Sequence, residues 1–126
     1  HLNLDARNFP LFIRSFFNSI SFFIPEVEGF VRITVERAIP FVTNKDILKE
    51  ARHLIEEEVA HSKVHGQYNK LLEKEGYNLK AYEFLTKKLI SFGDRFLSLK
   101  FQLAGSACIE HLVGSMGVVG IDHGIF

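Results

Sequence analysis

The sequence predicts an all-α protein, and three observations carry this prediction. Apolar residues recur with helical spacing through most of the chain. Neither a sustained alternation of apolar and polar residues nor an Asn-Gly or Asp-Gly hairpin turn is present. Proline, glycine and asparagine stand at positions where helices start and stop. The 126 residues fit one helical domain, 1–126, which is long enough to bury a core.

The first third of the chain predicts two helical segments separated by a proline. Pro10 favours the first turn of a helix over 11–24, and Pro25 is expected to break or kink that helix. The helical pattern resumes over 26–39 and stops before Pro40. We therefore expect an apolar, Phe-rich helix followed by a more polar one.

A long helix is predicted over 46–75. Thr43 and Asn44 offer an N-cap, because their side-chain oxygens accept hydrogen bonds from the first free backbone N–H groups. Gly76 is a natural C-terminal residue, since glycine adopts the left-handed conformation that ends many helices. The spacing of apolar residues between these signals is that of a single uninterrupted helix.

Two further helices are predicted after the long one. Asn78 caps a helix over 79–92, which we expect to end at Gly93. Asp94 then introduces a helix over 95–116, which is followed by a glycine-rich end. No internal repeat or interdomain linker interrupts this order.

The composition excludes several classes of partner. Fifteen basic residues balance fifteen acidic ones, so no general electrostatic field attracts nucleic acid or an anionic membrane surface. Polar residues interrupt the Phe-rich stretch 9–24, which is also shorter than the roughly 20 apolar residues that a membrane span needs. The single cysteine, Cys108, predicts a reduced, buried thiol and a cytoplasmic location.

The long helix carries a pattern that is typical of metal sites. Glu58, His61 and His65 are spaced i, i+3 and i+7, which places them on one stripe that also carries apolar residues. A carboxylate and an imidazole at i and i+3 converge on one point, and the Glu-x-x-His pattern forms half of a two-metal site in helical bundles. Glu56 and Glu57 turn away from Glu58 by about 100° per residue and are read as solvent-facing. On its own, the same spacing also occurs on solvated helix faces.

Two other helices also bring a carboxylate to an apolar face. Glu28 is flanked at helical spacing by apolar residues, and so is Glu110. A buried carboxylate must be protonated, paired with a cation or bound to a metal. Arg32 offers a partner for Glu28, whereas no obvious cation serves Glu110. Together with Glu58, these residues indicate a metal site shared by three helices.

These positions carry a resemblance to a bacterial family of predicted metal-dependent hydrolases, which belongs to the ferritin-like superfamily. The resemblance covers residues 10–115 and rests on the stretches "IPEVEGFVR", "EEVAHSKVH" and "IEH". Val27 replaces a glycine of the family pattern, and Glu57 replaces a glutamine. The resemblance implies a ferritin-like helical bundle that acts on a small-molecule substrate through a dinuclear metal site, with iron expected and Mn or Zn as alternatives.

The resemblance also implies roles for individual residues. Glu28 would be a terminal ligand, Glu58 a bridging ligand and His61 a nitrogen ligand, while Glu110 supplies the carboxylate of a third helix. The roles of His65 and His111 stay open between orienting the ligands and binding the metal.

This chain departs from the full pattern at its C-terminal end. A complete site takes Glu-x-x-His from two helices, whereas only one such pattern is present and the sequence ends at "GIDHGIF". The bundle is therefore expected to lack its final helix in this chain. Three explanations stay open: the sequence is truncated, a second subunit of a homodimer supplies that helix, or this member has lost it. Asp122 and His123 are weaker substitutes for the absent ligands.

Three functions stay open at this stage. The first is a non-haem di-iron enzyme that uses O₂ to oxidise a small organic substrate, because carboxylate-rich ligation suits iron. The second is hydrolysis by a metal-activated water, as the family label states. The third is a non-catalytic helical module that binds metal or forms oligomers, which the absent ligands favour.

Overall fold

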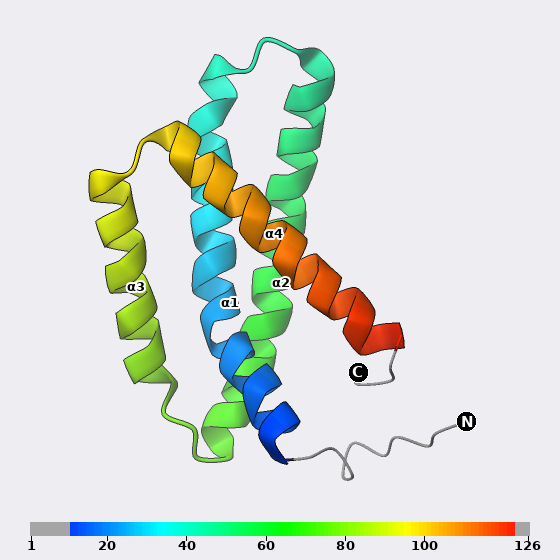
Figure 1. The fold of residues 1–126 in the computed structure, drawn as a ribbon, viewed down its shortest axis with the longest axis vertical. Helices are drawn as coiled ribbons and strands as arrows, with labels where there is room; N and C mark the ends of the chain where they lie inside the picture. Colours follow the sequence, from blue (N-terminus) through cyan, green and yellow to red (C-terminus); the bar gives the residue numbers. More distant parts are fainter. Residues whose placement is uncertain (1–10, 123–126) are drawn as a thin grey trace.

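The computed structural model describes residues 11–122 and confirms the all-α prediction. Within this range there are four α-helices, a short 3-10 helix and no strand (Figure 1). The elements are α1 (Leu11–Ala38), η2 (Ile39–Phe41), α2 (Lys45–Lys74), α3 (Leu79–Phe96) and α4 (Leu99–Asp122). No helix in this range is long and apolar enough to cross a membrane.

Helix α1 is the centre of the bundle. It packs against α2, α3 and α4, whereas contacts among those three are sparse. In Figure 1, α2 runs alongside α1, α3 lies on another side of α1, and α4 crosses obliquely. The buried apolar residues accordingly lie mainly on α1 and at the α2–α3 turn: Phe22, Val31, Val35, Leu72 and Leu79. Side chains of α1 therefore face several other helices at once.

Of the two predicted outcomes at Pro25, a break or a kink, the break is wrong, because α1 continues through this residue. Proline has no N–H group, so the carbonyl of Ser21, four residues earlier, lacks its usual helical partner. The side-chain amide of Asn69 on α2 donates a hydrogen bond to that carbonyl at 3.0 Å. Ser21 Oγ in turn donates to Asn69 Oδ1 at 2.9 Å. A side chain 48 residues away thus satisfies the group that the proline leaves free.

We expect Asn69→Ala to destabilise the protein by roughly 1–3 kcal/mol, because it leaves the partly buried carbonyl of Ser21 without its donor. The measurement is the free energy of unfolding by urea denaturation. Lys70→Ala is the matched control, since Lys70 is an exposed neighbour on the same helix. Equal stability of the two variants would show that Asn69 does not support α1 at Pro25.

The predicted signals at both ends of α2 are confirmed. Asn44 Oδ1 accepts hydrogen bonds from the backbone N–H groups of Asp46 and Ile47 at 2.8 and 3.2 Å. At the other end, Gly76 has a φ of 97°, which side chains other than glycine rarely tolerate. The backbone N–H groups of Gly76 and Tyr77 bond back to carbonyls of the last turn at 3.0 and 3.2 Å. Both ends of the helix are therefore fixed by local sequence.

The predicted end of α3 at Gly93 is wrong, since this helix continues to Phe96. Asp94 does not start a new helix but forms an ion pair with Arg37 of α1, with 2.9 Å between Oδ1 and Nη1. Helix α4 instead begins after Ser98, whose hydroxyl accepts a hydrogen bond from the Phe101 N–H at 3.3 Å.

Cys108 is exposed, which corrects the prediction of a buried thiol. Helix α4 is apolar on most of its circumference, so its sequence alone does not identify the inward face. Among the residues of α4 whose burial is described, Gln102 and Ser106 are buried. At about 100° per residue, Cys108 points about 120° away from Gln102 and about 160° away from Ser106. The cytoplasmic location inferred partly from this cysteine stays a prediction.

Candidate metal site

Two carboxylates lie in the interior where α1 meets α2. The exposed fractions of Glu28 and Glu58 are only 6% and 2%. Each carboxylate sits on a helix face that otherwise packs against the neighbouring helix. Burying such groups costs free energy unless they are protonated, hydrogen-bonded or bound to a cation. The burial of Glu28 and Glu58 therefore has to be explained by protonation, hydrogen bonding or cation binding.

Three side chains of α2 surround the carboxylate of Glu28. Ser62 Oγ donates a hydrogen bond to Glu28 Oε2 at 2.9 Å. Glu28 Oε1 lies 4.0 Å from His61 Nδ1 and 3.9 Å from His65 Nε2. Both histidines therefore lie near Glu28, although the side chain of His61 is exposed. Ser62 was not among the predicted site residues.

Arg32 does not neutralise Glu28. Its guanidinium forms an ion pair with Glu36 instead, one turn further along α1, with 2.8 Å between Nη1 and Oε1. The alternative in which Arg32 pairs with Glu28 is therefore wrong. No lysine or arginine in the described part of the chain forms an ion pair with Glu28 or Glu58.

The environment of Glu28 favours its neutral form. Burial raises its pKa from an ordinary 4.5 to about 7, with the hydrogen bond from Ser62 acting in the opposite direction. The negative charges of Glu58 and Glu110 raise it further. Glu28 therefore changes its charge near neutral pH in the metal-free protein.

Glu58 and Glu110 belong to the same electrostatic cluster. Burial raises the pKa of Glu58, and the charge of Glu110 on α4 adds to this effect. Burial also raises the pKa of Glu110, while His61 lowers it. The pKa of His65 is lowered, first by burial and then by His61, which favours its neutral, ligand-competent form. Three helices thus bring their carboxylates within electrostatic reach of one another.

The donor atoms fit a cation chemically, but they do not form a closed coordination sphere. Within residues 11–122, no group of three or more His, Cys, Asp or Glu side chains is arranged to hold a metal ion. Glu58 Oε2, however, is buried and has no hydrogen-bond partner among the described residues. An unpaired buried carboxylate oxygen beside two raised-pKa carboxylates and two imidazoles is a donor set that a divalent cation would stabilise.

The remaining predicted residues lie at the margin. His111 is exposed and, with Glu110, lines a shallow pocket of about 530 Å³ on α4. No ion pair or hydrogen bond of its side chain to the cluster is observed in the described part of the chain. Asp122 is exposed at the end of α4, and His123 lies outside the described residues.

Sequence reasoning missed two contributors to the site. Ser62 lies four residues after Glu58, so helical spacing places both on one face and could have identified it. Glu57 was read as solvent-facing, and it is exposed, yet its charge raises the pKa of both Glu58 and Glu110. The effect on Glu110 depends on the approach of α4, which no local sequence pattern indicates.

Comparison with known proteins agrees with the resemblance noted from the motifs. Residues 9–125 match the model of a protein family described as "Predicted metal-dependent hydrolase". Searches of curated proteins and of solved structures returned no match. The assignment to the ferritin-like superfamily stays a prediction, because the all-α bundle does not by itself distinguish that superfamily. With most of its length matched, the chain belongs to the predicted metal-dependent hydrolase family.

Proposed function

We propose that this chain is a metal-dependent hydrolase whose cation is bound by Glu28, Glu58, His61 and Glu110, with His65 beside them. The observation that carries the proposal is the buried Glu58 Oε2, which has no hydrogen-bond partner among the described residues. Because that oxygen makes no hydrogen bond, the side chain can rotate toward a cation without breaking one. The family description supports the same reading.

When bound, a divalent cation supplies Lewis acidity, which polarises a carbonyl or phosphoryl oxygen and lowers the pKa of water. The chain's own residues would hold the cation. Glu28 has a pKa of about 7 in the metal-free protein, so it would give up its proton near neutral pH as the cation binds. Ser62 holds one oxygen of Glu28 in place through its hydrogen bond, which leaves Oε1 on the side of the histidines.

A second candidate function is O₂-dependent oxidation at a di-iron centre. The favouring observation is the ratio of ligands: three carboxylates from three helices accompany two histidines from one helix. Carboxylate-rich ligation on facing helices is typical of di-iron and di-manganese bundles. Such a site needs a second Glu-x-x-His in addition to the residues described here. A second chain of a homodimer is one source of that pattern.

The test combines metal content with two activity measurements. Elemental analysis of the purified protein, alongside its mass in solution, is expected to find bound divalent metal. Metal-loaded protein is then assayed on a panel of esters and phosphoesters with Zn²⁺ or Mn²⁺, and for O₂ consumption with Fe²⁺. Hydrolysis that a chelator abolishes supports the proposal. O₂ consumption without hydrolysis supports the di-iron function instead. Bound metal with neither activity would point to the non-catalytic alternative, and a folded protein that binds no metal would refute both enzymatic proposals.

A further inference from the structure

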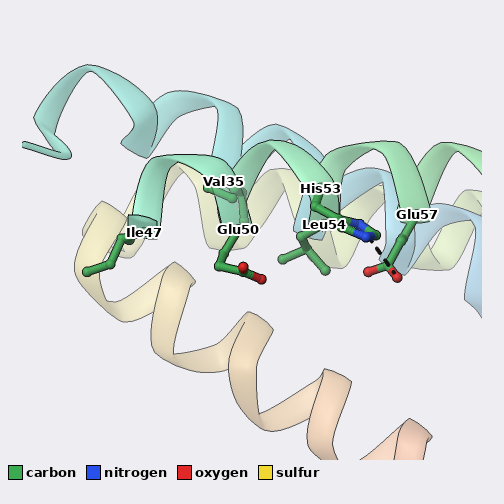
Figure 2. Close-up of a pocket in the computed structure, with 7 residues that line it drawn as sticks. Val35, Ile47, Glu50, His53, Leu54 and Glu57 are labelled. Carbon is green, nitrogen blue, oxygen red and sulfur yellow. Dashed lines mark ion pairs between the residues drawn. The ribbon is translucent and has the colours of Figure 1, made fainter. Parts of the chain in front are cut away.

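A pocket of about 480 Å³ opens beside the proposed metal site, between α1 and the first half of α2. Its apolar part is formed by Val35 of α1 together with Ile47, Ala51 and Leu54 of α2. In Figure 2, Ile47, Glu50, Leu54 and Glu57 project from α2 toward the same side. The volume lies in the range of small-molecule sites, which are typically apolar with a few placed polar groups.

The polar part of this pocket is negatively charged. Its polar residues are Glu50, His53 and Glu57, and neither lysine nor arginine is among the seven residues that line it. His53 Nδ1 lies 3.7 Å from Glu57 Oε1, so those two groups face each other (Figure 2). Glu50 has no ion pair in the described part of the chain, and in Figure 2 its carboxylate lies apart from that pair, with Leu54 between them. The carboxylate of Glu50 therefore has no ion-pair partner and lines the pocket together with apolar side chains.

The pocket and the metal site share the same segment of α2. Glu57 lines the pocket, and Glu58, the next residue, is buried in the metal site. The charge of Glu57 acts on both Glu58 and Glu110. A molecule that occupies the pocket would thus lie next to the carboxylates of the site.

We propose that this pocket binds the part of the substrate that combines an apolar body with a positively charged ammonium group. The carbon body would rest on Val35, Ala51 and Leu54, and the nitrogen would face Glu50. Burial of apolar surface favours the body, and the carboxylate forms a charge-assisted hydrogen bond with the nitrogen. The same carboxylates repel anionic molecules, so anionic substrates are disfavoured. This inference rests on the proposed hydrolase function in one respect: the bound ammonium compound is a substrate only if the protein is a hydrolase. Binding to the pocket does not depend on that function.

The test compares hexylammonium with hexanol, which has a similar length and no charge. Calorimetry on the full chain is expected to show hexylammonium binding at least about tenfold more tightly. Glu50→Gln should abolish this preference, because it removes the charge at an exposed position without disturbing the core. Glu56→Gln is the matched control, since Glu56 is also exposed on α2 but lies outside this pocket.

Three results would overturn the inference: equal binding of the two probes, an unchanged preference in Glu50→Gln, or no hexylammonium binding in the millimolar range. Repeating the titration with His61→Ala separates the pocket from the enzyme. Hexylammonium binding that persists there, while no hydrolysis is found with the wild-type protein, would refute the proposed function and leave the pocket standing. Loss of the preference in Glu50→Gln together with chelator-sensitive hydrolysis would support both.

Discussion

Glu58→Gln is expected to abolish metal binding while leaving the helices intact. The substitution keeps the shape of the side chain but removes the charge that a cation requires. Changes to residues that only orient metal ligands cost about 10–100-fold in affinity, so the loss of a central ligand should cost at least about 100-fold. The measurement is metal content after dialysis, with circular dichroism to verify the helical content.

His61→Ala is expected to give the same loss, because its imidazole Nδ1 lies 4.0 Å from Glu28 Oε1 and is a candidate ligand. Glu56→Ala is the control: Glu56 is exposed and should change the free energy of unfolding by no more than about 0.5 kcal/mol, with metal content unchanged. Full metal load in both the Glu58 and the His61 variants would refute the assignment of the site.

The second expected result concerns the stability of the metal-free protein at different pH values. The pKa of Glu28 is about 7 in the folded chain and an ordinary 4.5 in the absence of its environment. Between these values the folded state binds more protons than the unfolded state, so the free energy of unfolding falls as pH rises from 4.5 to about 7. Because a tenfold change in proton affinity corresponds to about 1.4 kcal/mol, the total loss is roughly 3 kcal/mol.

Glu28→Gln should remove this loss. The variant is expected to match the wild-type protein below pH 4.5 and to be more stable by up to roughly 3 kcal/mol above pH 7. Glu58 and Glu110 act in the same direction as Glu28, whereas the lowered pKa of His65 removes stability as pH falls below its ordinary 6.5. All three are present in both proteins, so the difference between the two urea titrations, measured with a chelator, reports on Glu28 together with its coupling to Glu58 and Glu110. Parallel pH profiles would show that Glu28 is not destabilised by burial.

Metal binding should reverse this dependence. A cation requires ionised carboxylates, so its affinity is expected to increase as pH rises through the same range. The carboxylates that destabilise the metal-free fold would then stabilise the loaded one, because ligand binding to the folded state adds to its stability. Buried carboxylates with raised pKa values destabilise the metal-free fold, and such perturbed pKa values are typical of functional sites.

The sequence by itself determined the all-α class, both ends of α2 and most of the residues from which the candidate site is built. Some signals act over only a few residues and can be recognised from the sequence alone: helical periodicity, the Asn44 cap and Gly76. The same periodicity placed Glu28 and Glu58 on apolar faces, and both are buried in the structure. The metal assignment for these residues, and for His61, His65, Glu110 and His111, stays a prediction.

Only the tertiary structure decided the features that depend on a second helix. Pro25 does not end α1, because Asn69 of α2 supplies the missing hydrogen bond. Ser62, rather than Arg32, contacts Glu28, and Cys108 faces outward because α4 presents another face to α1. Local patterns record which side of a helix is apolar, but they do not record which residue of another helix lies opposite. Long-range packing fixes those pairs, and the charges and hydrogen bonds of the site follow from them.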